Sequence, residues 1–244
     1  MISVRSRTWV KKIVCVATVL FCIFPLTAYR TYAAQYDPRS DSCVYFSVKD
    51  ERKRIALSFD DGPLEGKTDK ILDVLDRYGV KATFFMVGSQ AKYCPETAMR
   101  VAAEGHEIGN HTQNHKNLAA MKPKELDEEI ANAEREIYNA CGYIPSLFRP
   151  PEGVCTEKIS NAAKLRGYSI VMWSVDTLDW QGKAASVIAE NVLSNVKSGS
   201  VILMHDGIFS VSHTAEALDI IIPKLLEEGY EFVTVGELIA YSPE

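Results

Sequence analysis

Two adjacent carboxylates stand between an apolar run and a Gly-Pro turn in the stretch "RIALSFDDGPLEG", residues 54–66. Acids are uncommon where a buried strand ends, and neighbouring acids repel each other. The repulsion is relieved if one of the pair, Asp60 or Asp61, binds a divalent cation. The other carboxylate could then accept a proton from a cation-bound water, whose pKa falls from about 16 toward roughly 7. A helix-capping role would explain one of these acids but not the second.

A second pattern, "HTQNH", places His111 and His115 four residues apart. If this segment is helical, both imidazoles lie on one face of the helix. Two imidazoles and one carboxylate form a site for zinc or a similar divalent ion and leave a coordination position for water. Alone the pattern is weak, but here a carboxylate pair follows another strand. Of the other histidines, His106 begins a strand and is expected to be structural, and His213 is expected to face solvent at the start of a helix.

The elements that must position these residues alternate between strand-like and helical runs. Several of the helical runs end at glycine, which is the common residue after a helix C-terminus. The seven strand-like segments are "RIALSFD", "KATFFMVG", "HEIGNH", "SLFRPP", "SIVMWSVD", "SVILMHD" and "EFVTVGELI", with a further short candidate in "VYFSV". Alternating units predict parallel strands with right-handed crossovers, either as an open doubly wound sheet or as a barrel.

The positions of the polar residues favour the barrel. Six of them end or follow five different predicted strands: Asp60, Asp61, His111, Arg149, Asp176 and His205. The carboxyl ends of barrel strands converge on one face, where enzymes of this architecture build their active sites, whereas an open sheet would spread them along a crevice. We therefore predict an α/β fold, a distorted (β/α) barrel with about seven parallel strands.

The first 34 residues differ from the rest of the chain. Basic residues precede an apolar run, Ile13 to Ala28, and small residues follow at 31–34. This pattern predicts a secretory signal peptide or, if it is not cleaved, a membrane anchor through residues 13–29. The remainder is then exported to the cell envelope or the extracellular space. We expect residues 35–53 to be a lead-in segment and residues 54–244 to form one domain.

The charge of the chain argues against nucleic acid as a partner. The formal net charge is −5, and residues 1–34 contain five basic residues and no acid, so the exported part carries a net charge of −10. Nucleic-acid binding requires a basic surface. A monomer is expected.

Four cysteines lie outside the apolar segment: Cys43, Cys94, Cys141 and Cys155. No two of them have Cys-x-x-Cys spacing, which argues against a thiolate metal site. The four cysteines either form two disulfides or remain free thiols. Cys94 and Cys155 follow strands, whereas Cys141 ends a helix and is expected on the opposite face of the barrel. If disulfides form, the expected pairs are therefore Cys94–Cys155 and Cys43–Cys141.

Five motifs in order resemble those of the polysaccharide deacetylases, the NodB-homology group or carbohydrate esterase family 4. They are "SFDDGP", "HTQNH", "FRPPEG", "WSVDTLDW" and "ILMHD", and the resemblance covers roughly residues 54–240. Five motifs in order are a specific signal, although each alone is weak. The resemblance implies a distorted barrel that performs metal-dependent hydrolysis of an N-acetyl group on a sugar and releases acetate.

The resemblance also implies a role for individual residues. Asp60 is similar to the catalytic base and Arg149 to the residue that pairs with it. His205 is similar to the general acid that protonates the leaving amine, and Asp179 to the acid that orients this histidine. These roles are chemically reasonable, because an amine leaves poorly unless it is protonated and a nearby carboxylate stabilises imidazolium.

The resemblance further assigns the metal ligands to Asp61, His111 and His115. The ion is expected to be zinc, with Co²⁺, Ni²⁺ or Mn²⁺ as alternatives. The walls of the substrate and acetyl pocket are expected to include Pro151, Glu152, Trp180 and Leu203.

Glu152 departs from the family pattern, in which an aromatic residue usually follows the second proline of the third motif. Its backbone N–H is retained as an oxyanion donor, so the departure affects substrate identity and not catalysis. The expected substrate is an N-acetylated glycan of the cell envelope. Peptidoglycan is the first choice, and the expected activity resembles that of the peptidoglycan N-acetylglucosamine deacetylases. Chitooligosaccharide and acetylated xylan are alternatives, and a glycan-binding module without turnover is the alternative from a different class.

Overall fold

A computed structural model describes residues 36–207 and 212–241. The chain divides into two units, Met1–Gln35 and Tyr36–Glu244, and the second contains the fold. The predicted signal peptide or anchor, residues 1–34, lies outside the described residues. Within the described ranges, no helix is both long and apolar enough to cross a membrane.

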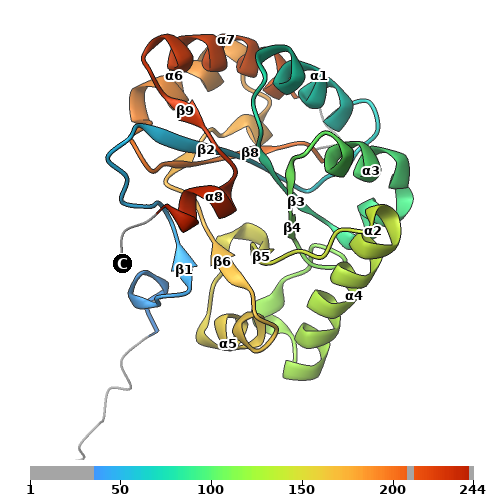
Figure 1. Cartoon of the computed structure of the whole chain (residues 1–244). Helices are drawn as coiled ribbons and strands as arrows, with labels where there is room; N and C mark the ends of the chain where they lie inside the picture. Colours follow the sequence, from blue (N-terminus) through green and yellow to red (C-terminus); the bar gives the residue numbers. More distant parts are fainter. Residues whose placement is uncertain (1–35, 208–211, 242–244) are drawn as a thin grey trace, which may run out of the picture. The chain divides into compact units, whose positions relative to one another are not determined.

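Strands occupy the middle of this unit and helices surround them (Figure 1). The described strands are β1 (Val44–Tyr45), β2 (Arg54–Asp60), β3 (Thr83–Met86), β4 (Glu107–Asn110), β5 (Leu147–Phe148), β6 (Ser169–Val171), β7 (Val175–Asp176), β8 (Val201–His205) and β9 (Glu231–Phe232). The described α-helices are α1 (Thr68–Tyr78), α2 (Gly88–Tyr93), α3 (Pro95–Ala103), α4 (Pro123–Cys141), α5 (Glu157–Leu165), α6 (Ala185–Asn195), α7 (Thr214–Glu227) and α8 (Val235–Ala240). Short 3₁₀ turns cover Pro38–Ser40, Leu118–Ala120, Pro151–Gly153 and Asp179–Gln181.

All paired strands run parallel, in the order β1-β6-β5-β4-β3-β2-β8-β7, and β9 pairs with the beginning of β2. The described part of the chain has no ladder between β1 and β7, so the sheet curls without closing through a strand pair. An antiparallel bridge from Ser47 to Ser200 brings the segment after β1 to the beginning of β8. The predicted distorted (β/α) barrel of parallel strands is confirmed, as a curled incomplete barrel.

The sequence of β2 explains how the barrel is filled. Ile55, Leu57 and Phe59 belong to the core cluster that includes the apolar sides of α1, α6 and α7, so they face outward toward the helices. The alternate residues face the barrel interior, because strand side chains point to opposite faces with a period of two. Of these, Ala56 packs in an inner cluster and Ser58 bonds Arg149. Asp60, the next inward residue, ends the strand at the carboxyl face.

Helix α8 packs against the inner apolar cluster from the amino ends of the strands. Its Val235 and Leu238 contact a cluster that contains inward residues of β2, β3, β5, β6 and β8. The segment "EFVTVGELI" was predicted as one strand, and this was wrong beyond Phe232. Thr234 accepts a bond from Glu237 N (3.3 Å) while the Glu237 carboxylate accepts one from Thr234 N (2.9 Å). This capping box starts a helix where the apolar pattern alone indicated a strand.

Two further differences concern strands. The segment "SIVMWSVD" forms two strands, β6 and β7, because the chain leaves β6 after Val171 and pairs with β8 from Val175. The candidate strand "VYFSV" is a strand only over Val44–Tyr45, which pairs with β6. Trp173, which is partly buried, lies in the chain between these two strands.

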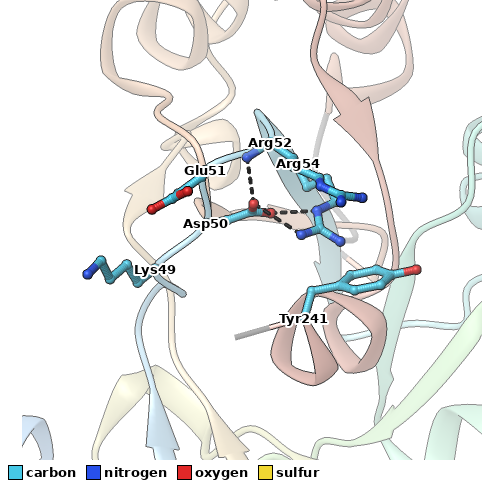
Figure 2. Close-up of a pocket in the computed structure, with 6 residues that line it drawn as sticks. All are labelled: Lys49, Asp50, Glu51, Arg52, Arg54 and Tyr241. Atoms are coloured by element: carbon cyan, nitrogen blue, oxygen red, sulfur yellow. Dashed lines mark hydrogen bonds and ion pairs between the residues drawn. The ribbon is translucent and has the colours of Figure 1, made fainter. Parts of the chain in front are cut away.

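The entry to β2 is held by ionic contacts at the end of the barrel opposite the carboxyl face (Figure 2). The Asp50 carboxylate accepts bonds from Arg54 Nε (2.7 Å) and from Arg52 N (2.7 Å). The Arg54 guanidinium lies 3.7 Å from the centre of the Tyr241 ring. These contacts join the lead-in segment to the end of α8.

The four cysteines are free thiols in the structure. This agrees with the free-thiol alternative, and neither expected pair is formed. Cys141 Sγ donates to Ile137 O within α4, and Cys155 Sγ lies 3.8 Å from the Tyr36 hydroxyl.

Candidate active site

The register of the central strands brings the predicted base and acid to one place. Strands β2 and β8 pair with Asp60 opposite His205 and with Ser58 opposite Leu203. Residues opposite each other on neighbouring strands share a face, so both polar side chains point to the barrel interior at its carboxyl end. His111 follows β4 and Arg149 follows β5, and both are buried.

Asp61, His111 and His115 form a cluster with the donor set of a metal site. The Asp61 Oδ1 atom lies 3.4 Å from His111 Nε2 and 3.2 Å from His115 Nε2. One potential ligand atom from each residue lies within 4.8 Å of the others. Asp61 Oδ1 is buried and accepts no hydrogen bond from the described residues, so a divalent cation would satisfy it. These residues fit a divalent cation.

The second metal-ligand candidate is held in one tautomer. His111 Nδ1 lies 2.7 Å from the Arg149 carbonyl, which can only accept, so Nδ1 carries the proton and donates. The Nε2 lone pair is then free to face Asp61. Such a bond to the ring nitrogen away from the ion is the usual way in which a protein orients a metal-binding histidine.

The segment "HTQNH" is a loop, and the conditional helix for it was wrong. Thr112 and His115 have left-handed backbone angles, with φ of 69° and 50°. The Asn110 side chain accepts from Thr112 N at 2.8 Å, and Thr112 Oγ1 accepts from His115 N at 3.2 Å. These local bonds replace helical ones, because short polar side chains compete for the backbone. The turn brings the two imidazole centres to 5.0 Å.

Asp60 and Arg149 form a buried ion pair. Arg149 Nη1 donates to Asp60 Oδ1 at 2.7 Å and to Ser58 Oγ at 3.0 Å. The remaining guanidinium nitrogens donate to the carbonyls of Val171 and Met172, both at 3.0 Å. Burial lowers the pKa of Arg149, and the Asp60 charge and hydrogen bond oppose this. An arginine remains charged in such a setting, so Asp60 keeps a fixed cationic partner.

Asp179 forms hydrogen bonds with both the imidazole ring and the backbone of His205. Its Oδ1 lies 2.7 Å from His205 Nδ1, and its Oδ2 accepts from His205 N at 2.9 Å and from Thr214 Oγ1 at 2.7 Å. Burial alone would lower the pKa of His205, but the hydrogen bond and charge of Asp179, with the charges of Asp60 and Asp61, raise it to about 9. His205 is therefore an imidazolium at neutral pH.

The pKa of Asp61 is lowered, whereas that of His205 is raised. Burial of Asp61 favours its neutral form, but the neighbouring His111 ring and the charges of His115 and His205 lower its pKa to about 2. The carboxylate is thus ionised and available to a cation over the physiological range.

A cavity of about 500 Å³ opens beside these groups. Its lining residues are Asp60, Asp61, His111, His115, Glu152, Gly153, Trp173, Asp176, Trp180, Leu203 and His205. Leu203 is buried at its base and Trp180 is half exposed at its rim. The cavity therefore contains the predicted base, the predicted acid and the Asp61 cluster beside apolar walls, and its volume is sufficient for a sugar ring.

Most of the predicted site residues meet in this cavity. Pro151 is buried and is not among the lining residues, and Glu152 lines it with a left-handed φ of 58°. Trp173 and Thr214 belong to the site but were not predicted. Trp173 could have been noticed as the aromatic residue two positions after the end of β6, whereas nothing local marks Thr214 as a partner of Asp179.

Comparisons with known proteins agree with this geometry. Residues 47–171 match the polysaccharide deacetylase family. A peptidoglycan-N-acetylglucosamine deacetylase of Bacillus cereus is 42% identical over 82% of this chain and 73% of its own length. A peptidoglycan-N-acetylmuramic acid deacetylase of Bacillus subtilis is 39% identical over 79% of this chain and 40% of its own length. A chitooligosaccharide deacetylase of Bradyrhizobium is 35% identical over 76% of this chain and 90% of its own length.

Solved structures give the same result for the fold. The peptidoglycan N-acetylglucosamine deacetylase Bc1960 superposes with a TM-score of 0.76 and 40% identity, over 83% of this chain and 95% of that chain. A carbohydrate esterase family 4 pseudoenzyme from Bacillus anthracis also superposes with a TM-score of 0.76, at 28% identity, over 80% of this chain and 68% of that chain. Because the second protein is a pseudoenzyme, the fold alone does not establish turnover.

The matched region, the identity to named deacetylases and the parallel incomplete barrel all point to one group. Hydrolytic deacetylation of glycans is the activity of that group. The cavity of this chain contains the side chains of Asp61, His111 and His115, which are suited to bind a metal ion. This chain belongs to the polysaccharide deacetylase family, carbohydrate esterase family 4.

Proposed function

We propose that this chain removes the acetyl group from N-acetylglucosamine in peptidoglycan and releases acetate. The observation that carries the proposal is the placement of two paired proton-transfer groups, Asp60 with Arg149 and His205 with Asp179, in one cavity with the Asp61 cluster. The identity to named peptidoglycan deacetylases supports the choice of polymer.

Each residue has a distinct task in this reaction. Asp60 accepts the proton of the attacking water, and the hydrogen bond from Arg149 orients its carboxylate. Asp61, His111 and His115 would hold a divalent cation, which lowers the pKa of a water ligand and polarises the amide carbonyl when it is bound. His205 then donates a proton to the departing amine nitrogen, since an unprotonated amine leaves poorly.

The apolar walls give the reaction its specificity for a small acyl group. Leu203 is buried at the base of the cavity, where a methyl group removed from water is stabilised by roughly 1 kcal/mol. Trp180 lies at the rim with half of its surface exposed, as an aromatic platform on which a sugar ring can pack.

Zinc is the proposed ion because catalytic zinc sites use three protein ligands, often two histidines and a carboxylate. Cobalt is an alternative, since an acetyl xylan esterase of this family from Clostridium thermocellum was solved with a cobalt ion. Metal analysis of the purified protein distinguishes these ions.

Residues 1–34 are proposed to export the protein to the cell envelope, either as a cleaved signal or as an anchor through residues 13–29. In the proposed domain organisation, residues 35–53 are a lead-in segment and residues 54–244 form the deacetylase domain. The protein is proposed to act as a monomer. N-terminal sequencing of protein recovered from the envelope fraction tests the cleavage.

Glu152 is proposed to adjust substrate preference. Its carboxylate is exposed at the rim of the cavity, and among the described residues it has no hydrogen-bond donor. Burial lowers the pKa of His115, and the negative charge of Glu152 opposes this at a distance. The same charge would attract an amine already exposed on the glycan. The variant Glu152→Gln should change the preference between fully and partly acetylated oligosaccharides without changing metal content.

The test of the proposed function is a screen of the purified protein against peptidoglycan, chitooligosaccharide and acetylxylan, with acetate and new amine groups as the readouts. We expect the highest kcat/KM on peptidoglycan and loss of turnover after chelation. The variant Asp60→Asn is the matched control for adventitious hydrolysis. Turnover restricted to chitooligosaccharide would instead indicate the activity named for the chitooligosaccharide deacetylase relative. Tight glycan binding with no acetate release would identify a non-catalytic binding protein.

A further inference from the structure

Asp206 is a third buried carboxylate near the metal cluster, and none of the proposed steps uses it. It follows His205 at the end of β8, its side chain is buried, and it does not line the catalytic cavity. Both of its oxygens accept hydrogen bonds from the segment that follows Asp61. Oδ1 accepts from Gly62 N at 3.0 Å, and Oδ2 accepts from Thr68 Oγ1 at 2.7 Å.

Thr68 extends this contact along the same segment. Its Oγ1 accepts from Leu64 N at 2.8 Å, so its own proton is free to point to Asp206. Asp206 is thus connected directly to the first residue after Asp61 and, through Thr68, to the third. The Asp206 backbone N–H also donates to the Asp60 carbonyl at 3.0 Å, on the other side of Asp61.

The backbone at Asp61 needs this support. Its φ is +77°, in the left-handed region that a residue with a side chain adopts at a cost of about 1 kcal/mol or more. Two glycines allow the close approach around it. A Cβ atom at Gly62 would lie 2.1 Å from Asp206 Oδ2, and one at Gly207 would lie 2.1 Å from the Asp61 main chain.

We propose that Asp206, acting with Thr68, is the positioning residue for the metal-ligand candidate Asp61. It holds the turn after Asp61 so that Oδ1 stays near the imidazoles of His111 and His115, and it makes no contact with an ion itself. Without these bonds the turn can relax away from the left-handed region, and the ligand has to be ordered again each time an ion binds. The inference rests on the proposed use of Asp61 as a ligand.

Zinc affinity of the full chain tests the proposal, measured by competition with a chromophoric chelator and without any glycan. Asp206→Ala leaves Gly62 N and Thr68 Oγ1 without an acceptor, and should weaken zinc binding by roughly 10- to 100-fold, the usual loss when a partner behind a ligand is removed. Asp206→Asn keeps an acceptor for Gly62 N and should retain most of the affinity. Thr68→Val should weaken binding in the same direction, and Thr68→Ser should restore it.

Thr83 offers a matched control elsewhere in the barrel. Its buried Oγ1 donates to Glu107 Oε2 at 2.7 Å and accepts from Val235 N at 2.8 Å, the same pattern as at Thr68. Thr83→Val should lower the Tm about as much as Thr68→Val but leave the zinc Kd within about twofold of the wild type, because Thr83 has no connection to the turn after Asp61.

The proposal is overturned if folded Asp206→Ala, with a wild-type circular dichroism spectrum and a cooperative unfolding transition, binds zinc like the wild type. It is also overturned if Thr68→Val and Thr83→Val change the zinc Kd equally, or if the wild type binds no zinc. If Asp206→Ala does not fold, the Thr68→Val and Thr68→Ser pair decides. Asp206-dependent zinc binding in a wild type that releases no acetate would contradict the proposed deacetylase function but support this positioning role.

Discussion

Asp60 and Asp61 are adjacent in the chain, but their carboxylates have different partners. Asp60 accepts from a fully buried arginine at 2.7 Å, whereas Asp61 Oδ1 lies within 3.4 Å of two imidazole nitrogens and accepts no hydrogen bond from any described residue. The difference arises because Asp60 is the last residue of a strand and Asp61 turns into the left-handed region. One side chain therefore faces the barrel interior, and the other faces the loop that contains His115.

The two carboxylates should be separable by mutation. Asp60→Asn should lower kcat by about 10²–10⁴-fold, the usual effect of a positioned proton-transfer group, while the protein keeps its metal. Asp61→Asn should lower metal content and activity together, as should His111→Ala. Metal analysis and acetate release on the same preparations check this. Asp60→Asn protein that is purified without metal would show that the roles are exchanged, and full metal content in His111→Ala would remove this histidine from the site.

The His205–Asp179 pair should set the alkaline limb of the pH profile. The pKa of His205 is raised, so the imidazolium needed as acid is present at neutral pH and activity falls as pH rises through that pKa, which is about 9 in the metal-free chain. A cation at Asp61 opposes part of the rise, so the limb of the loaded enzyme should lie below 9. Asp179→Asn should move the limb of kcat/KM to lower pH by roughly one to three units.

Asp176→Asn is the control for this experiment. Asp176 lies on the same cavity, but its carboxylate accepts from Leu178 N at 2.9 Å and does not contact His205. Its variant should keep the alkaline limb of the wild type. An Asp179→Asn enzyme with an unmoved limb would show that Asp179 does not tune His205.

At the scale of elements, the junction of α3 and β4 depends on a neutral histidine. His106 Nδ1 accepts from Ala82 N at 3.1 Å, just before β3, and the ring contacts Phe84 edge-on. Burial, with the nearby charges of Lys81 and Arg100, lowers the pKa of His106 to about 4. It lies at the amino end of its strand, which agrees with the structural role predicted from the sequence.

This depressed pKa predicts a loss of stability in acid. The unfolded chain protonates His106 near pH 6.5 and the folded chain only near 4, so its contribution is present above 6.5 and is lost as pH falls between these values. The loss should reach about 3 kcal/mol at most, since one pKa unit corresponds to about 1.4 kcal/mol. Urea unfolding at pH 7.5 and 4.5 measures it.

His106→Asn isolates this residue, because an asparagine oxygen can accept from Ala82 N and does not titrate. The variant should lose less stability between the two pH values than the wild type does. His213→Asn, at the start of α7, is the control and should keep the wild-type difference. Equal losses in His106→Asn and the wild type would assign the acid sensitivity to other groups.

At the scale of the whole molecule, the metal cluster joins segments that are distant in the chain. Asp61 follows β2, whereas both histidines follow β4. An ion bound there stabilises the folded chain over the unfolded one by mass action, by about 2.7 kcal/mol when free metal is 100-fold above its Kd. For a domain of this size the Tm should then fall by roughly 5–10 °C when the ion is removed with a chelator.

Differential scanning calorimetry with and without chelator checks this shift. Re-addition of zinc should restore the Tm. His111→Ala should have a Tm that does not respond to the chelator, and a chelator-sensitive Tm in this variant would place the stabilising ion elsewhere.

The sequence by itself determined the parts that depend on local pattern. The period-two alternation of "RIALSFD" places Ala56, Ser58 and Asp60 on one face of a strand, and alternating strands and helices require parallel pairing. Parallel strands bring their carboxyl ends together, so the polar residues that follow them were predicted at one site. The five motifs predicted a base, an acid and ligand candidates because these residues keep their order along the chain.

Only the tertiary structure decided which side chains make contact across long separations. Asp206 and Thr214 have no local feature that reveals their bonds to Gly62 and Asp179, since these partners are far away in the chain. The loop at "HTQNH" also depends on context, because Glu129 of α4 accepts from the Asn114 side chain at 2.8 Å and from its backbone at 2.9 Å. A histidine spacing of four is equally compatible with a helix and with this turn, and the energy that selects the turn comes from a helix that begins 8 residues after His115.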